Sequence, residues 1–364
     1  MKRKLLVTAI AALTLSACQE AQETSTTEND VVEVNMAPAT TAVPLTPPPG
    51  PIVAGEPVPV VAHPDQLAVL RHDDPAQAAN KKLLFDMWRT VLNAGHLEMA
   101  DTFVAEDYRQ YSPFQRSGRE ALKETFSVIP RQDTVPDTMR PAPVTFIAED
   151  DKVVFVAVES LPEPDGSGTY TTTHFNMFEV TDGKLSAHWH PDQTAPCPEL
   201  PDAANGGPQT VTGVEGVAQF AMLDAATPEL AANKRLVFDM WRHLIDAGRE
   251  ETVDLYLAED YIQHNPNAAT GRAGARAYFS SREDQPIEVA LRSPLVAMLA
   301  EEDIVVQVIK TEMPNPYRAG ETYTSTWFDM FRIKDGRIAE HWDAALKPGT
   351  DVVEMGSECS APAE

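Results

Sequence analysis

The chain has 364 residues, of which 43% are hydrophobic and 23% charged, so its composition is that of a globular protein long enough for two domains. Its 55 acidic and 29 basic residues give a net charge of -26, which would repel nucleic acid and anionic lipid surfaces, and we expect no nucleic acid partner. Three cysteines exclude a disulfide scaffold and a zinc module built from cysteine pairs.

The N-terminus has the pattern of a secretory signal. Three basic residues at positions 2–4 precede an apolar run from Leu5 to Leu15, and small residues follow up to Cys18. The apolar run is too short to span a bilayer as a mature helix. Residues 15–18, Leu-Ser-Ala-Cys, resemble a bacterial lipobox, in which lipid is attached to the cysteine. We therefore predict a signal peptide over residues 1–17 and lipidation of Cys18; the alternative is a buried N-terminal helix.

The lipobox resemblance implies a location in the cell envelope. Gln19, rather than Asp, follows Cys18, and in the lipoproteins that this segment resembles that favours the outer membrane, facing the periplasm. The acyl chains would supply the anchor, at about 0.8 kcal/mol per buried CH₂. Residues 18–64 are rich in Thr and Pro and have no hydrophobic period, which predicts a disordered tether.

An internal repeat organises the rest of the chain. Residues 80–89 recur as residues 233–242, with eight of ten positions identical, at an offset of 153 that persists to His188-Trp189 and His341-Trp342. We predict two domains of similar fold, with a linker between them and a short tail. Their boundaries are 65–195 for the first domain, 196–217 for the linker, 218–348 for the second domain and 349–364 for the tail.

Each copy has the same order of predicted elements. Apolar spacing in the first copy predicts three helices, at residues 75–95, 97–104 and 119–128. The aromatic residues Phe85, Trp88, Phe238 and Trp241 lie on helical stripes and are predicted core. Four strands follow, at residues 144–147, 153–158, 170–180 and 185–190, the last two joined by an Asp-Gly turn. This order predicts an α+β fold, with three helices packed on a curved antiparallel sheet.

The second copy resembles a known family. Residues 261–266, Tyr-Ile-Gln-His-Asn-Pro, together with Gly271 and the segment from Asp329 to Asp343, are similar to a SnoaL-like domain of the nuclear transport factor 2-like superfamily. The resemblance implies two tandem cone-shaped α+β barrels, each with a pocket between helices and sheet. Such domains often dimerise through the open face of the sheet, so a tandem pair could build an internal pseudo-dimer of the two repeats.

The last strand of the second copy carries the predicted chemistry. Residues two apart on a strand share a face, so His341 and Asp343 point the same way. A two-residue turn at Asp335-Gly336 would place Phe328 and Met330 on that same face. A carboxylate desolvated by apolar neighbours is a stronger base, and an imidazole can move a proton near neutral pH. We therefore predict Asp343 as the base.

The resemblance implies roles for the other site residues. His341 and His264 would orient a substrate or stabilise an enolate oxygen, and the ligand-binding residues would be Tyr261, Gln263, Asn265, Phe328 and Met330. Cyclases of this kind need acid and base groups alone, so we predict no cofactor and no metal. The alternative is that residues 261–266 form a turn and that the last strand packs the edge of the sheet.

The first copy departs from this pattern. It has Tyr111-Ser112-Pro113 where the second has His264-Asn265-Pro266, and His190 where the second has Asp343. Because the base is missing, we interpret it as a divergent copy. His188 and His190 share a strand face and are predicted ligand-binding residues. They could bind a metal if a third ligand approached, but no third ligand is identifiable.

One cysteine lies beyond the last strand of each copy. Cys197 and Cys359 could form a disulfide between the ends of the two domains, in an oxidising compartment, or could remain two free thiols.

Three function classes remain open. The first is a lyase, cyclase or isomerase that acts on a small carbonyl compound. The second is a lipoprotein that binds a small apolar molecule without turnover, and the third is a scaffold module of the envelope.

Overall fold

The computed structural model describes residues 45–46, 52–53, 55–191, 200–315 and 317–350. The predictions for Cys18, Cys197 and Cys359, the signal peptide at 1–17 and most of the tail concern positions outside these residues. None of the helices in the described part of the chain combines the length and apolar character that a bilayer span requires.

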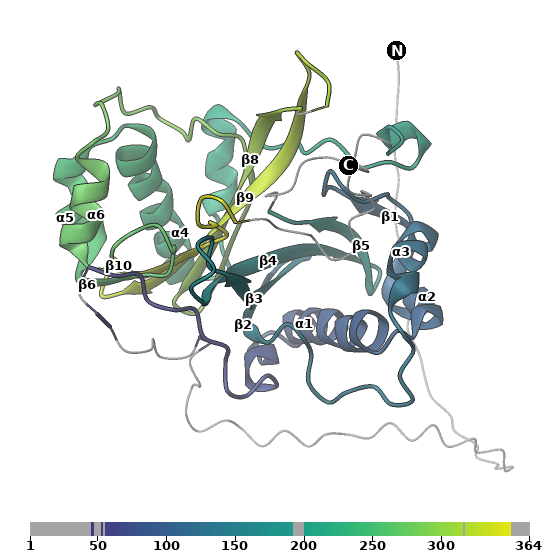
Figure 1. Cartoon of the computed structure of the whole chain (residues 1–364). Helices are drawn as coiled ribbons and strands as arrows, with labels where there is room; N and C mark the ends of the chain where they lie inside the picture. Colours follow the sequence, from purple (N-terminus) through teal and green to yellow (C-terminus); the bar gives the residue numbers. More distant parts are fainter. Residues whose placement is uncertain (1–44, 47–51, 54, 192–199, 316, 351–364) are drawn as a thin grey trace, which may run out of the picture. The chain divides into compact units, whose positions relative to one another are not determined.

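The first repeat forms a mixed α+β domain. Its helices are α1 (Pro75–Met87), α2 (Ala100–Phe103) and α3 (Arg119–Thr125). Its strands are β1 (Val104–Gln110), β2 (Pro143–Glu149), β3 (Lys152–Pro162), β4 (Thr169–Thr181) and β5 (Lys184–Trp189). They form one sheet in the order β1-β5-β4-β3-β2, and α1 packs against β2 and β3 (Figure 1).

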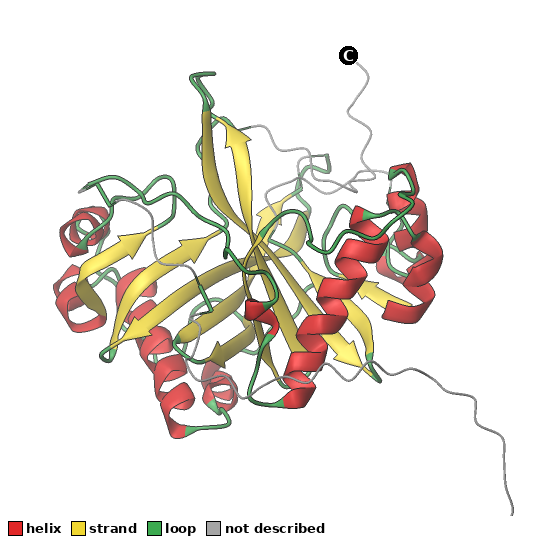
Figure 2. Ribbon diagram, turned by 90° about the horizontal axis from the view of Figure 1, so that it is seen from below, coloured by secondary structure: helices red, strands yellow, loops and turns green. Residues whose placement is uncertain are grey.

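The second repeat has the same elements in the same order. Its helices are α4 (Pro228–Met240), α5 (Val253–Tyr256) and α6 (Arg272–Phe279). Its strands are β6 (Leu257–Gln263), β7 (Leu295–Glu301), β8 (Ile304–Pro314), β9 (Thr322–Lys334) and β10 (Arg337–Asp343), in the sheet order β6-β10-β9-β8-β7. The predicted tandem α+β architecture is confirmed, and in Figure 2 the helices lie outside the strands of both sheets.

Each sheet has five strands rather than the four predicted. The additional strands, β1 and β6, pair in parallel with β5 and β10, so the sheets are mixed rather than purely antiparallel. In β6 the exposed residues Glu259 and Asp260 are adjacent, which interrupts the alternation of buried and exposed positions. The sequence pattern therefore did not predict β6 as a strand, although β6 carries the predicted ligand-binding residues Tyr261 and Gln263.

The first helix of each repeat begins and ends with recognisable signals. Asp74 and Thr227 cap α1 and α4, and a proline occupies the first turn of each helix. After Met87 and Met240 the chain continues as a π-helical turn, Trp88–Asn93 in the first repeat and Trp241–Asp246 in the second. Such wider turns are often found at functional sites.

Two kinds of core stabilise the molecule. Each repeat has a core between its helices and the inner face of its sheet, and this core contains the predicted Phe85, Trp88, Phe238 and Trp241. A third core joins the outer faces of the two sheets. There Phe175 of β4 stacks on Phe328 of β9, with ring centroids 5.5 Å apart.

Reciprocal ion pairs flank this shared core. Lys81 of α1 binds Glu301 at the end of β7, and the equivalent Lys234 of α4 binds Glu149 at the end of β2. The second carboxylate oxygen of each Glu accepts a backbone N–H from the opposite repeat, at 2.9 Å from Ala148 and 2.8 Å from Ala300. Burial raises the pKa of Glu301 to about 7, against the charge of Lys81.

The segments before each repeat cross to the other repeat. Val58 N–H donates to the carbonyl of Gln263 in β6 at 2.8 Å, and Gln209 N–H donates to that of Gln110 in β1 at 2.7 Å. Val58, Val60 and Val211 are at most 2% exposed. The predictions of a tether that extends to residue 64 and of a linker up to residue 217 are therefore wrong at these ends, because short apolar stretches there pack on the domains.

Candidate active site

The second repeat encloses a cavity of about 410 Å³ between its helices and its sheet. Apolar side chains from the π-helical turn, α6 and β9 form most of its wall, among them Trp241, Leu244, Phe279, Trp327 and Phe331. Most of the polar side chains gather where β6, β9 and β10 meet: Tyr261, Gln263, Asn265, Asp329, His341 and Asp343. Tyr278 and Arg282 line another part of the wall. The sequence-predicted residues Tyr261, Gln263, Asn265, His341 and Asp343 thus line one cavity.

The predicted position of Phe328 and Met330 is wrong. One extra residue, Ala339, forms a β-bulge in β10, so that His341 lies opposite Phe331 and Asp343 opposite Asp329. A shift of one residue exchanges the two faces of a strand. Phe328 and Met330 therefore point into the core between the two sheets, and Asp329 and Phe331 face the cavity in their place.

His264 does not reach the cavity. It follows Gln263 and points to the opposite side of the strand, where its ring stacks on Trp342 with centroids 4.8 Å apart. Its Nε2 lies 2.7 Å from Oε1 of Glu340, and its Nδ1 lies 2.7 Å from the carbonyl oxygen of Val58. The catalytic role predicted for His264 is not compatible with this position. Instead, His264 binds the segment around Val58 that precedes the first repeat, which we call its arm.

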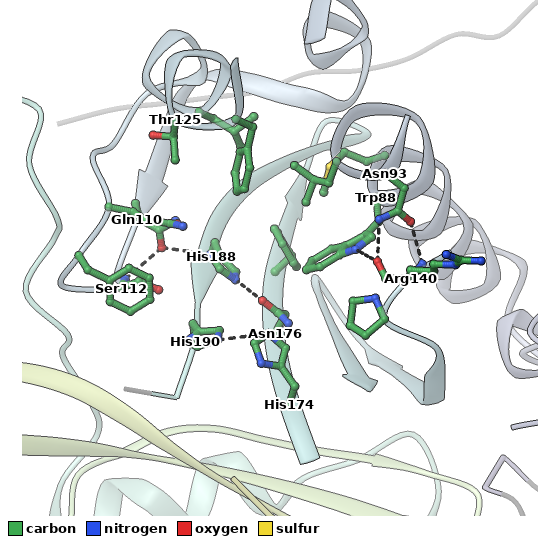
Figure 3. A pocket seen from close by; sticks show the side chains of 18 of the residues that line it. Trp88, Asn93, Gln110, Ser112, Thr125, Arg140, His174, Asn176, His188 and His190 are labelled. Carbon is green, nitrogen blue, oxygen red and sulfur yellow. Dashed lines mark hydrogen bonds between the residues drawn. The ribbon is translucent and has the colours of Figure 1, made fainter. Parts of the chain in front are cut away.

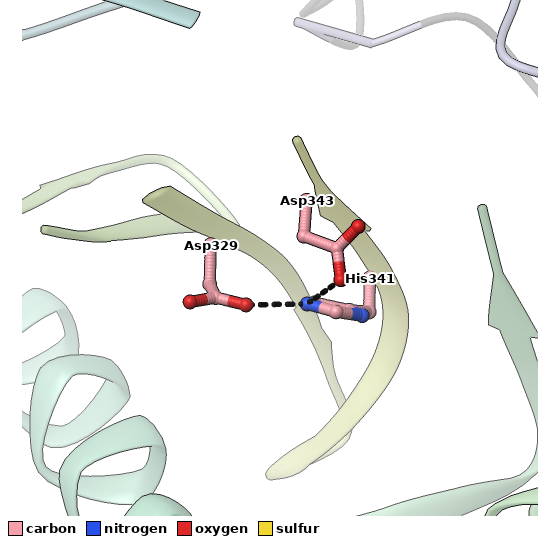
Figure 4. Close-up of side chains that lie close together, drawn as sticks. All are labelled: Asp329, His341 and Asp343. Atoms are coloured by element: carbon pink, nitrogen blue, oxygen red, sulfur yellow. Dashed lines mark hydrogen bonds and ion pairs between the residues drawn. The ribbon is translucent and has the colours of Figure 1, made fainter. Parts of the chain in front are cut away.

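Gln263 fixes the proton on one nitrogen of His341. The Oε1 atom of Gln263 accepts the backbone N–H of Asn265 at 2.9 Å, and it lies 3.0 Å from Nδ1 of His341. The amide oxygen of Gln263 has no proton to donate, so Nδ1 of His341 must be the donor in their hydrogen bond and carries a proton. The second nitrogen, Nε2, faces Oδ1 of Asp329 at 2.9 Å (Figure 4). That contact also needs a proton, which Asp329 and His341 must share.

Asp329 is the titratable residue of the cavity that sequence reasoning missed. It is 3% exposed, and burial raises its pKa to about 6, although the hydrogen bond to His341 acts in the opposite direction. Its Oδ2 is buried without a close hydrogen-bond partner in the described part of the chain, and the residue lines the cavity. A weaker interaction of the carboxyl with the Trp327 side chain also acts to lower its pKa. The available signal was a carboxylate between Phe328 and Met330 in an otherwise apolar strand.

Asp343 is held more firmly than Asp329. Its Oδ2 accepts a hydrogen bond from Nδ2 of Asn265 at 2.6 Å, and its Oδ1 accepts the backbone N–H of Ala345 at 3.1 Å. Nε2 of His341 lies 4.0 Å from the same Oδ2. Burial alone would lower the pKa of His341, but the hydrogen bond to Asp329 and the charge of Asp343 outweigh burial and raise it.

Tyr261 offers a hydrogen-bond donor to the cavity. Its hydroxyl oxygen accepts a hydrogen bond from Nε2 of Gln263 at 3.0 Å, so its own proton remains free to donate. Burial raises the pKa of Tyr261 well above its usual value, with a smaller contribution from the charge of Asp343. The phenol therefore stays protonated near neutral pH.

Asp329, His341 and Asp343 have the spacing of metal ligands, and they are the group of this kind found in the described residues. One ligand atom each from Asp329, His341 and Asp343 lies within 4.8 Å of the others. The sequence predicted no metal here. A cation could be held by these oxygens and nitrogen, but it would have to displace the proton between His341 and Asp329.

The first repeat has an equivalent cavity of about 450 Å³. Gln110, His188 and Asn176 repeat the network of Gln263, His341 and Asp329 (Figure 3), with Nδ1 of His188 at 3.1 Å from Gln110 Oε1 and its Nε2 at 2.9 Å from Asn176 Oδ1. The predicted pair His188 and His190 both line the cavity. The imidazole nearest His190 belongs to His174, whose Nε2 lies 3.3 Å from Nε2 of His190.

Comparison with known proteins connects this geometry to a family. A family model described as a SnoaL-like domain matches residues 85–188 and again residues 237–341, more than half of the chain. A search of curated proteins found no match.

Several solved structures resemble the chain. A protein from Acidithiobacillus ferrooxidans assigned as a polyketide cyclase is 18% identical, with 31% of this chain and 86% of that chain covered and a TM-score of 0.24. An LEH-like epoxide hydrolase of M. tuberculosis is 19% identical, with 32% and 80% covered and a TM-score of 0.24. A protein from Jannaschia sp. CCS1 assigned as a SnoaL-like polyketide cyclase is 16% identical, with 33% and 89% covered and a TM-score of 0.25.

Proposed function

The chain belongs to the family of SnoaL-like domains, and on that premise we propose that its second domain is a cofactor-independent acid–base catalyst acting on a small carbonyl compound. The predicted fold, a tandem of nuclear transport factor 2-like domains, is confirmed. The reaction would be a cyclisation, an isomerisation or a carbon–carbon lyase step, because each of these begins with a proton transfer next to a carbonyl group.

The observation that carries this proposal is the pair Asp329 and His341 on the wall of an apolar cavity. The two side chains share a proton across 2.9 Å, and the second oxygen of Asp329 is buried without a close partner among the described residues. A carboxylate with a pKa of about 6 exchanges protons efficiently near neutral pH, because the best general acid or base has a pKa close to the working pH.

The proposed reaction uses groups of this chain alone. The Asp329 carboxylate removes a proton from the carbon next to the carbonyl, the C–H electron pair becomes a carbon–carbon double bond, and the π electrons of the carbonyl group move onto its oxygen to give an enolate. The Tyr261 hydroxyl donates a hydrogen bond to that oxygen as its charge develops. The enolate carbon then either attacks a second carbonyl group or is protonated again, by Asp329 or at another position.

Asp343 and His341 support Asp329 in the proposed reaction and do not themselves remove the proton from the substrate. Sequence reasoning made Asp343 the base, but both of its oxygens are occupied, by Asn265 and by the N–H of Ala345. Its negative charge lies 4.0 Å from Nε2 of His341 and favours the protonated imidazole. We therefore assign proton transfer to Asp329 and His341, and electrostatic support to Asp343.

Exchange of hydrogen for deuterium next to a ketone tests the proposal without knowledge of the natural substrate. Full-length protein is incubated in D₂O with 1-tetralone or ethyl 2-methylacetoacetate, and the loss of the proton next to the carbonyl is followed by ¹H NMR. We expect exchange above the buffer rate, and a loss of about 100-fold or more in Asp329→Asn, because a general base contributes roughly 10²–10⁴-fold.

The first repeat provides matched controls. Asp329→Asn introduces the residue that the fold already accepts at the equivalent position, Asn176. His341→Gln should reduce exchange, whereas His188→Gln, the same change in the first cavity, should not. Addition of EDTA should leave the rate unchanged. No exchange with either probe, or exchange that survives Asp329→Asn, would contradict a catalytic role.

Binding without turnover is the second candidate function. It is favoured by the first cavity, which keeps the shape and the Gln–His pair of the site but has Asn176 in place of an acid. If both cavities hold a ligand and neither exchanges protons, the chain is a binding protein. A scaffold role has no comparable support in the described residues.

We further propose that the protein is anchored to the cell envelope by lipid on Cys18, at the outer membrane and facing the periplasm. The support is the signal-like pattern of residues 1–17 and the Leu-Ser-Ala-Cys sequence. We also propose that the duplication forms an internal pseudo-dimer. The support is that the ion pairs and the arms each occur twice, in exchanged roles.

A further inference from the structure

A fully buried glutamine lies beside the proposed base. Gln307 of β8 is 0% exposed and lies directly opposite Asp329 of β9 in their antiparallel ladder. Val305 and Ile309, two residues away on either side of Gln307, belong to the core between the helices and the sheet. Side chains at directly opposite positions of such a ladder have Cβ atoms about 4.5–5.5 Å apart. Gln307 and Asp329 are therefore neighbours on the inner face of the sheet.

Both of these neighbours have unused hydrogen-bonding capacity. The two amide atoms of Gln307, Nε2 and Oε1, are buried without a hydrogen-bond partner in the described residues, and Oδ2 of Asp329 is buried without a close one. Buried amides are nearly always paired, because an unpaired amide has lost its hydrogen bonds to water and gained none. A glutamine at such a position therefore indicates a polar partner, and the carboxylate oxygen of its cross-strand neighbour is a suitable one.

The first repeat shows that the fold does not require a polar residue at this position. There Phe155 of β3 lies opposite Asn176, as Gln307 lies opposite Asp329 in the second repeat. Phe155 packs in the core, with its ring centroid 4.9 Å from that of Trp88. The glutamine thus occurs with the acid and the phenylalanine occurs with the amide. This association links Gln307 to the chemistry of the acid rather than to packing.

The polarity of the two groups fixes the direction of a hydrogen-bonded link between them. An ionised carboxylate only accepts hydrogen bonds, so Nε2 of Gln307 is the donor of the link. In the described residues no direct hydrogen bond joins the two side chains, and a polar contact beyond about 3.5 Å is commonly bridged by water. A water molecule that accepts from Nε2 of Gln307 and donates to Oδ2 of Asp329 satisfies one atom of each side chain.

We propose that Gln307 is a positioning residue of the second site, which binds Oδ2 of Asp329 through one buried water molecule. His341 holds Oδ1 of the same carboxylate at 2.9 Å, so the link from Gln307 holds its other end and fixes its orientation. The second lone pair of Oδ2 remains for a proton of the substrate. Hydrogen bonds to a carboxylate stabilise its charged form, so Gln307 opposes the effect of burial on the base. The positioning role rests on the proposed function, whereas the hydrogen-bonded link itself does not.

Gln307→Met tests the positioning role in the deuterium exchange assay, because methionine has a similar length and no amide. Full-length protein is assayed with 1-tetralone over the acidic limb of the pH–rate profile. The titratable groups that face Asp329 are His341 and Asp343, and both are unchanged in this variant. We expect the limb to move to higher pH by about one pH unit, because the ionised base loses a hydrogen bond. On that limb the exchange rate falls about tenfold for each unit.

Met298→Leu is the matched control for this variant. Met298 of β7 lies opposite Gln307 on its other side and belongs to the same core. The change alters packing around Gln307 and leaves both polar groups in place, so the limb should not move. A purely structural role of Gln307 would lower the exchange rate by the same factor at every pH.

A crystal structure of the wild-type protein that shows ordered water tests the link without catalysis and without a variant that must fold. We expect one water molecule within about 3.2 Å of both the Gln307 amide and Oδ2 of Asp329. A wild type that exchanges no proton but contains this water contradicts the proposed function and supports the link. The inference is overturned if no water joins the two side chains, or if the limb of Gln307→Met stays in place or moves to lower pH.

Discussion

Asp329 and Asn176 occupy equivalent positions in the two repeats and touch equivalent histidines at the same distance, 2.9 Å. Two differences, Asn176 against Asp329 and His190 against Asp343, change the surroundings of the histidine in each repeat. His188 has a pKa lowered to about 3 by burial, whereas the pKa of His341 is raised because Asp329 and Asp343 outweigh burial. The buried imidazole is thus neutral in the first cavity, whereas in the second cavity it can be protonated.

The pH dependence of proton exchange follows from the carboxylates. Asp329 acts as a base only when ionised, so the exchange rate should rise with pH through its pKa of about 6. Asp343 adds a negative charge that raises the pKa of Asp329. In Asp343→Asn this charge is absent, and the acidic limb of the pH–rate profile should move to lower pH. A limb that stays in place or moves to higher pH would contradict the assigned roles.

At the scale of elements, helices and antiparallel strands were predictable because their periodicity is long and unbroken. The α+β class, the two repeats and the face shared by His341 and Asp343 followed from it. The strand β6 was not predictable, because Glu259 and Asp260 break its alternation. The β-bulge at Ala339 leaves no mark in composition, and it alone exchanged Phe328 and Met330 for Asp329 and Phe331 in the cavity.

Sequence patterns also could not predict which side chains one repeat buries against a segment of the other. His264 lies in a motif that resembles the family, yet its side chain faces Val58 and Glu340 because β6 pairs with the crossing arm. The composition of the arm, which contains Val58 and Val60, is typical of a disordered tether. Two buried valines, each worth about 1.5–3 kcal/mol, are sufficient to hold such a segment on a domain.

The whole molecule repeats its contacts as well as its sequence. Each repeat contributes a lysine on its first helix, a glutamate at the end of a strand, and an arm to the other repeat. Buried ion pairs contribute less to stability than their charge suggests, because desolvation opposes the attraction. Loss of one partner, however, leaves an uncompensated charge in the core.

Lys81→Met should therefore destabilise the protein by about 3–5 kcal/mol at pH 8, because Glu301 is left buried without its lysine. The remaining basic neighbour, Nε2 of His72, lies farther away, at 3.8 Å from Oε1 of Glu301. The carboxyl of Glu301 has a raised pKa in the folded state, so its unfavourable contribution grows as pH rises from its ordinary value through about 7. At pH 5 the carboxyl can be protonated, and the loss should be smaller. Urea denaturation at both pH values measures the free energy of unfolding.

Lys82→Met is the matched control for this prediction. Lys82 follows Lys81 on α1, and its side chain is 64% exposed and pairs with Asp86 on the same helix. Surface pairs of this kind contribute little, so we expect a change of at most about 0.5 kcal/mol at either pH. Equal effects of the two variants, or a larger effect of Lys81→Met at pH 5, would show that Glu301 is not the group responsible.

The most direct test of the central claim is an NMR titration of the aspartate carboxyl carbons in wild-type protein and in Asp329→Asn. The account predicts one aspartate that titrates near pH 6 in the wild type and is absent from the variant, because burial raises the pKa of Asp329 to about 6. If every aspartate titrates in the ordinary range, near pH 4, or if the signal near pH 6 persists in Asp329→Asn, then Asp329 is not the proton-transfer group.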